Sequence, residues 1–229
     1  MGIFGIGYPE AYGGTPGDIF YKIAASEEIL RSGSGGFAAS LGSLDIAIPP
    51  ILNLGTEDQK QKYVKPVLAG EKIAALGITE PGGGSDVANI QFERLTLAVM
   101  ANMTAQMALE EAMTYAGERE AFGKSIKGFQ VTRHKLVDMA TLVEVSREFT
   151  YRVAARIDAG QDQTREVSMA KNFACSVSDK VTYDAVQIFG GYGFMRGYLV
   201  ERLYRDNRIL SIGGGTTEVM KEIISKLML

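Results

Sequence analysis

The sequence has very few residues that form disulfides or bind transition metals. Its 229 residues include one cysteine, Cys175, and one histidine, His134. A single cysteine excludes an internal disulfide, and zinc and haem sites normally need several His or Cys ligands. We therefore expect no metal, a reducing compartment, a buried thiol at Cys175 and a surface imidazole at His134.

Strong charge and long apolar runs are also scarce. The formal net charge is -3 and basic residues do not cluster, which argues against a nucleic-acid or acidic-lipid partner. No apolar run approaches the ~18 to 20 residues of a membrane-spanning helix, and residues 1–9 lack a basic targeting region. With 46% hydrophobic residues the chain is predicted to fold as a cytoplasmic protein, or in the mitochondrial matrix if eukaryotic.

The first third of the chain predicts helices after a glycine-rich loop. Apolar spacing indicates a helix over 18–31, with Gly33 as its stop, and a buried helix over 37–54 bent at two prolines. Thr56 and Gln59 form a capping box for a helix over 57–69, which Gly70 ends. A short apolar run over 73–78 predicts a strand that leads into a glycine loop.

The remainder of the chain predicts a bundle of long helices over 93–118, 131–159, 165–189 and 217–228. Apolar side chains recur on one face of the second and third of these helices: Leu136, Met139, Val143 and Phe149, and then Met169, Phe173, Val177, Val181 and Ala185. We interpret both stripes as core. The predicted fold class is therefore mainly all-α.

Four segments resemble the acyl-CoA dehydrogenase family. They are residues 77–86 (GITEPGGGSD), 119–124 (REAFGK) with the following Phe129 and Gln130, 187–194 (QIFGGYGF) followed by Arg202 and Asp206, and 204–218, which includes three glycines at 213–215. Gly197 departs from the family pattern, which usually has an acidic or amide residue there. The resemblance implies helical domains that pack as in that family, with a C-terminal four-helix bundle.

The resemblance also implies a set of cofactor and substrate residues. FAD would be bound by Ile78, Thr79, Ser85, Arg119, Phe122, Gln130, Gln187, Gly190, Gly191, Thr216 and Glu218. The acyl-CoA thioester would be bound by Ser85, Arg94, Gly213 and Gly214. Arg119 suits a pyrophosphate because its guanidinium donates two parallel hydrogen bonds, and Phe122 suits an aromatic ring. Taken alone, Arg119 would be an exposed charge at a helix end and the glycine triplet an ordinary loop.

The catalytic base implied by the resemblance is Glu93. Many members carry a catalytic Glu at the place of Gly214, whereas the isovaleryl and long-chain branches carry it before Arg-Leu, which Glu93, Arg94 and Leu95 match. Apolar neighbours of Glu93 would raise its pKa, as removal of an α proton requires. Without the resemblance, Glu93 would be read as a charge that complements a helix dipole.

The resemblance breaks between Ile90 and Gln91, where the family has a whole β domain. The predicted domains are thus a partial N-terminal helical domain (1–76), a remnant of the β domain (77–90) and a C-terminal bundle (91–229). We expect weakened FAD binding, or its loss. Two functions remain: a flavoenzyme that oxidises acyl-CoA, with electron-transfer flavoprotein as acceptor, and a non-catalytic helical scaffold. By analogy, either would form a homodimer or homotetramer.

Overall fold

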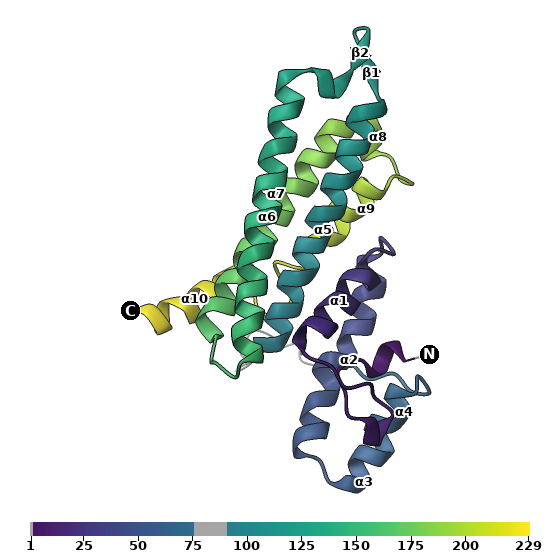
Figure 1. Cartoon of the computed structure of the whole chain (residues 1–229), viewed down its shortest axis with the longest axis vertical. Coiled ribbons are helices and arrows are strands. Elements are labelled where there is room, and N and C mark those ends of the chain that lie inside the picture. Colours follow the sequence, from purple (N-terminus) through teal and green to yellow (C-terminus); the bar gives the residue numbers. More distant parts are fainter. Residues whose placement is uncertain (1, 76–90) are drawn as a thin grey trace, which may run out of the picture.

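The computed structural model describes residues 2–75 and 91–229, and within these ranges the chain is mainly helical. A smaller N-terminal lobe lies at one end of an elongated bundle of long helices (Figure 1). The one sheet in the described ranges is a two-stranded hairpin at the opposite end of the bundle. This agrees with the predicted mainly all-α class.

The N-terminal lobe consists of short helical turns and two longer helices. Its elements are η1 (Ile3–Gly5), η2 (Glu10–Tyr12), α1 (Ile19–Leu30), α2 (Gly35–Leu54), α3 (Glu57–Gln59), η3 (Lys60–Val64) and α4 (Lys65–Leu68). The carboxylate of Asp18 caps α1 by accepting from the Tyr21 backbone N–H at 2.8 Å. The predicted capping box of Thr56 and Gln59 is confirmed. The helix predicted after it contains a π turn, η3, in its middle.

Helix α2 is less buried than its sequence predicts. Only Ala38, Leu44 and Ile48 of its 20 residues are buried. By length and composition alone α2 could also cross a membrane, so the expectation that no segment reaches that length is wrong. In the fold, Asp45 of α2 accepts a hydrogen bond from Tyr8 at 2.8 Å and pairs with Lys22 of α1. These polar contacts hold the middle of α2 within the lobe.

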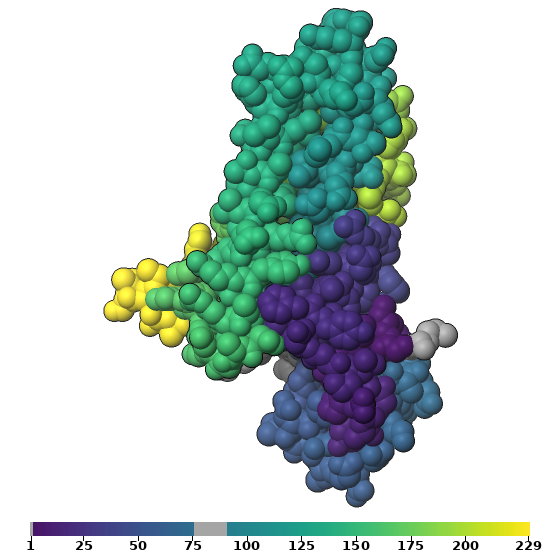
Figure 2. Space-filling view, in the orientation of Figure 1, coloured from purple at the N-terminus to yellow at the C-terminus, as the bar shows by residue number. Residues whose placement is uncertain are grey.

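The bundle is built on three long helices that the sequence predicts almost to the residue. Its elements are α5 (Gln91–Glu118), β1 (Glu120–Ala121), β2 (Lys124–Ser125), η4 (Ile126–Gly128), α6 (Gln130–Asp158), α7 (Thr164–Phe189), α8 (Gly191–Phe194), α9 (Leu199–Asn207) and α10 (Thr217–Met228). Helix α9, which the sequence analysis missed, packs against α5 and α7. Helix α10 packs on α7 and protrudes from the side of the bundle (Figure 2).

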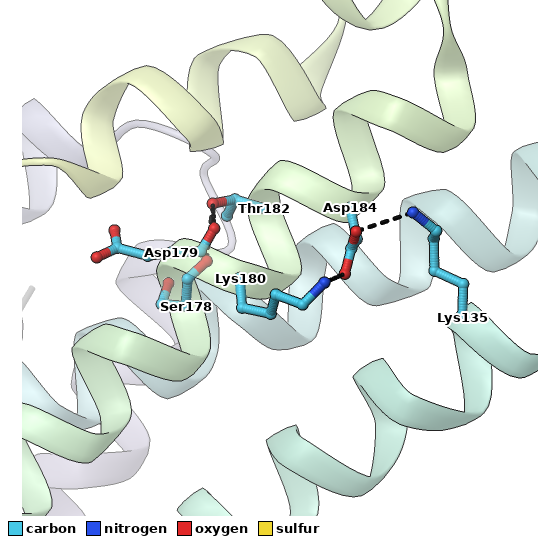
Figure 3. A network of polar contacts seen from close by, with 6 residues as sticks. All are labelled: Lys135, Ser178, Asp179, Lys180, Thr182 and Asp184. Atoms are coloured by element: carbon cyan, nitrogen blue, oxygen red, sulfur yellow. Dashed lines mark hydrogen bonds and ion pairs between the residues drawn. The ribbon is translucent and has the colours of Figure 1, made fainter.

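Apolar and polar contacts both hold the long helices together. The stripe predicted on α7 is confirmed at Val177, Val181 and Ala185 but is wrong at Phe173, which is exposed. Beside it, the buried carboxylate of Asp184 on α7 pairs with Lys180 one turn away and with Lys135 of α6 (Figure 3). This ion network ties α6 to α7.

The lobe and the bundle share two apolar clusters, and one of them lies at the start of α5. Ile19 and Ile23 of α1 pack with Leu95 and Val99 of α5. The contact lies in the first turns of α5, so it fixes the environment of the residues just before Leu95. Of the strand predicted over 73–78, residues 73–75 are in neither a helix nor a strand, and the rest lies outside the described residues.

Candidate functional site

The predicted site residues fall into two groups at opposite ends of α5. Glu93 lies in the first turn of α5, and Arg119 follows its last residue. At the rise of an α-helix, about 40 Å separates these two positions. Figure 1 shows the start of α5 near α10 and its end at the hairpin β1–β2. Ile78, Thr79 and Ser85 lie outside the described residues.

The first group brings Glu93 against the glycine turn, residues 213–215, which connects α9 to α10. Gly214 has a positive φ of 62° and sits so close to α5 that a Cβ on it would lie 3.5 Å from both Cδ and Oε1 of Glu93. The same Cβ would lie 2.4 Å from Leu97 Cδ1. Both the backbone conformation and the close approach therefore favour glycine at this position.

The carboxylate of Glu93 is half-buried and incompletely paired. Its Oε2 is buried without a hydrogen-bond partner among the described residues, and so is Nε of the neighbouring Arg94. Burial raises the pKa of Glu93, while the positive charges of Arg94 and Lys171 oppose this. The direction agrees with the apolar neighbours seen in the sequence. An unpaired carboxylate of raised pKa can accept a proton from a molecule placed beside it.

Two residues of α7 that the sequence analysis missed complete this group. Lys171 has 0% exposure, and its Nζ donates to the backbone oxygen of Gly215 at 2.6 Å. The amide of Asn172 donates to the backbone oxygen of Thr217 at 3.1 Å. A sequence signal was present, because Lys171 lies four residues after Val167 and four before Cys175, both of which are buried. A lysine on such an apolar helix face is uncommon.

Thr216 and Glu218 lie beside the glycine turn, at the start of α10. The hydroxyl of Thr216 accepts from the Val219 backbone N–H at 3.3 Å and caps the helix. Glu218 is exposed, and hydrogen bonds from its own backbone N–H and from the Thr216 hydroxyl lower its pKa. Among the described residues these two side chains cap the helix N-terminus.

The second group forms an open pocket at the far end of α5. Arg119, Gly190 and Gly191 line it together with Tyr115 and Tyr192. Two sequence motifs about seventy residues apart thus meet here, because α5 and α7 pack against each other and end side by side. A Cβ on Gly190 or Gly191 would meet nothing within 4 Å, so the backbone there is open to a ligand.

The other predicted cofactor residues are exposed near this pocket but do not line it. Phe122 is 95% exposed at the tip of the hairpin and has a positive φ of 53°, which is rare for a residue with a side chain. Gln130 lines a separate open groove with His134 and Asp184. Gln187 is exposed on the last turn of α7. One copy of the chain therefore does not gather all of these residues in one pocket.

A further apolar pocket lies between the lobe and the bundle. It is lined by residues of η1, α1, α2 and α5, including Phe4, Ile29, Leu41, Gly42, Thr96 and Met100. Thr96 and Met100 follow Glu93 by three and seven residues on α5, so the three lie on one face of that helix. The sequence analysis proposed none of these residues for the site, because the pocket forms only where the lobe meets the bundle.

Comparisons with known proteins identify the family of the chain. Residues 82–229 match the family model for the acyl-CoA dehydrogenase C-terminal domain, and residues 1–71 match the model for the N-terminal domain. A probable acyl-CoA dehydrogenase from Mycobacterium abscessus has a crystal structure similar to this fold, with a TM-score of 0.96 and 34% identity, covering 100% of this chain and 88% of that one.

Two curated relatives are similar along the whole chain. They are the caffeyl-CoA reductase-Etf complex subunit CarC of Acetobacterium woodii, 29% identical over 332 positions, and an acyl-CoA dehydrogenase of Bacillus subtilis, 29% identical over 331 positions. Each alignment covers 100% of this chain and 87% of the relative. Both alignments are longer than the 229 residues present here, so the relatives contain residues without a counterpart. Residues 2–75 and 91–229 are mainly helical and contain no middle β domain. The chain belongs to the acyl-CoA dehydrogenase family.

Proposed function

We propose that the chain catalyses the α,β-dehydrogenation of an acyl-CoA thioester, with Glu93 as the general base. The observation that supports this most directly is the position of the Glu93 carboxylate, 3.5 Å from the point where a side chain on Gly214 would begin. Many members of the family carry their catalytic Glu at that place. A carboxylate from α5 would therefore occupy the same site as a carboxylate from the turn.

The chemistry requires a base that can take a weakly acidic proton. The α proton of a thioester is removed at neutral pH only by a base of raised pKa, with donors near the carbonyl oxygen. Burial raises the pKa of Glu93, and its Oε2 is available to receive the proton. Loss of the α proton to Glu93 and of the β hydrogen as hydride leaves a C=C bond. FAD, when bound, supplies the acceptor for that hydride.

The substrate would lie between Glu93 and the apolar pocket. The glycine turn exposes backbone groups that can approach the thioester closely, and Arg94 supports the adjacent carboxylate electrostatically. Beyond it, the apolar pocket formed by α1, α2 and α5 suits an aliphatic acyl chain, because its lining is mainly apolar. We therefore propose a fatty acyl thioester as the substrate class.

The second group of residues fits the nucleotide part of FAD. Arg119 is exposed, and among the described residues it has no ion-pair partner. Its guanidinium can bind a pyrophosphate in a bidentate manner, and the open backbone of Gly190 and Gly191 allows a nucleotide to come close. Phe122 and Gln130 would contribute an aromatic ring and an amide at the same end of the bundle.

The separation of the two groups implies that FAD is shared between copies of the chain. Glu93 and Arg119 are about 40 Å apart along α5, which is longer than one dinucleotide. A second copy placed antiparallel would bring its Arg119 and Phe122 to the Glu93 end of the first. We propose a homodimer or a homotetramer made of such pairs. The exposed, strained Phe122 fits insertion into a neighbouring subunit.

We propose electron-transfer flavoprotein as the electron acceptor. The Acetobacterium woodii relative is named as a subunit of a caffeyl-CoA reductase-Etf complex and is similar to the whole of this chain. That relative is also named as a reductase, so the direction of electron transfer, to or from the acyl-CoA, would depend on the reduction potentials of the substrate and the electron carrier.

The function is tested by flavin absorbance and turnover. Protein reconstituted with FAD is expected to be yellow, and acyl-CoA is expected to bleach it. Glu93→Gln should lower kcat about 10²- to 10⁴-fold, the usual contribution of a general base, with flavin retained. Glu111→Gln, on the same helix but far from the glycine turn, is the matched control. Absence of flavin binding and of bleaching by any acyl-CoA would favour the alternative, a non-catalytic helical scaffold.

A further inference from the structure

Lys171 is a buried cation that no contact to a carboxylate explains. It lies two turns into α7 and is the largest of the fully buried side chains among the described residues. Among the described residues it has no carboxylate within ion-pair distance, and its Nζ has one hydrogen-bond acceptor, the backbone oxygen of Gly215. An ammonium with three donors is costly to bury with so few partners. Such a group is retained more readily for a functional reason than for stability.

The contacts of Lys171 and its neighbour fix the path of the glycine turn. Lys171 binds the oxygen of Gly215 at 2.6 Å, and Asn172 binds the oxygen of Thr217 at 3.1 Å. Gly214, which directly precedes Gly215 in the chain, is the residue of the turn that approaches Glu93. Lys171 and Asn172, which are adjacent on α7, therefore hold the glycine turn, whose backbone approaches the Glu93 carboxylate.

The charged and titratable groups near Lys171 come from three helices. Glu93 and Arg94 belong to α5, Glu218 to α10 and Cys175 to α7 itself. Glu93 is influenced in turn by the positive charges of Arg94 and Lys171. The ammonium is thus coupled both to the turn, by a hydrogen bond, and to the carboxylate, by charge.

We propose that Lys171 is a positioning residue for proton abstraction, which holds the glycine turn against Glu93 and maintains a positive charge near the carboxylate. This inference rests on the proposed role of Glu93 as base. Lys171 itself touches neither the α carbon nor the proton. Its loss should misplace the turn and make Glu93 harder to ionise.

The test compares Lys171→Met with Lys180→Met in the full chain. Both changes remove an ammonium from α7, but Lys180 is exposed and contacts Asp184, which keeps Lys135 as a partner (Figure 3). Without flavin, Lys171→Met should speed hydrogen exchange at residues 212–218 and raise the Glu93 pKa in a carbon-13 titration. With flavin it should lower kcat about tenfold to a hundredfold, as a misplaced catalytic group does, and move the acid limb of kcat/KM to higher pH.

Lys171→Arg separates the two effects and replaces Lys171→Met if that variant does not fold. It keeps the charge, so the acid limb should stay in place, while the wider guanidinium should still speed exchange in the turn. Exchange and Glu93 titration equal to those of Lys180→Met would overturn the inference. Turnover that survives Glu93→Gln would instead overturn the proposed function, because the exchange measurement does not depend on catalysis.

Discussion

At the scale of single residues, Glu93 is held in a state that suits a base and works against stability. Burial raises its pKa, and one of its oxygens has no partner among the described residues. A folded-state pKa above the unfolded value means that the folded chain binds more protons. The free energy of unfolding therefore falls as pH rises from the unfolded pKa of Glu93 to its folded pKa, and stays low above that.

Glu93→Gln should for this reason stabilise the protein at alkaline pH while removing activity. Glutamine has nearly the same shape and no charge to desolvate. We expect an increase in the free energy of unfolding of up to about 1 kcal/mol at pH 8, with the difference from wild type vanishing near pH 4. Urea unfolding at the two pH values measures it. A variant that is less stable than wild type at pH 8 would contradict the account.

The sequence motifs identified several residues of the candidate site but not the residues of α7 that contact them. Glu93 and Gly214 stand out through their motif, and the structure brings them together. The spacing of Lys171 from Val167 and Cys175 places it on a buried helix face, but the sequence does not say which distant segment its ammonium and the Asn172 amide contact. Burial is set by the elements that pack on the helix, here the turn before α10.

At the scale of elements, capping residues and periodicity predicted most helices, and tertiary contacts decided the rest. Asp18 and Thr56 mark helix starts because their side chains satisfy free backbone N–H groups. Helix α9 was missed because its sequence is short and highly charged, so it forms chiefly through its packing on α5 and α7. Helix α2 was predicted as buried from its apolar composition, yet much of it is exposed.

Gly42 on α2 gives an element-scale prediction about chain length. It lines the apolar pocket, and a Cβ there would meet nothing within 4 Å. Gly42→Leu should fill the pocket and lower kcat/KM for long acyl-CoA about tenfold to a hundredfold relative to short acyl-CoA, as loss of pocket space does. Stability should not fall, because leucine favours helix over glycine by about 0.8 kcal/mol.

The control is Gly36→Leu, also on α2 and also in open space but outside the pocket lining. Kinetics with a series of acyl-CoA lengths distinguish the two. An equal shift in both variants would show that the effect comes from the helix and not from the pocket.

At the scale of the whole molecule, the length of α5 is the basis for the proposal that two copies of the chain make one site. Glu93, the proposed base, lies in the first turn of this helix, and Arg119, proposed to bind the nucleotide, follows its other end (Figure 1). A site that needs both groups must therefore take them from two chains. No local feature of either motif carries this information.

Mixing two inactive variants tests the shared site. Glu93→Gln and Arg119→Ala should each be inactive alone, but random pairing of the two should restore up to about a quarter of wild-type activity, because one site of each mixed dimer has both native residues. Turnover after co-refolding measures this. If Arg119 acted on the FAD of its own chain, mixing would restore nothing.

The sequence by itself determined the family and the long helices and singled out Glu93 as the proposed base, because periodicity, caps and short motifs are local properties of the chain. Only the tertiary structure decided that Glu93 meets Gly214, that Lys171 is buried behind the turn, and that α5 separates two groups of residues. Those facts depend on which distant segments share space, and packing of whole helices fixes that.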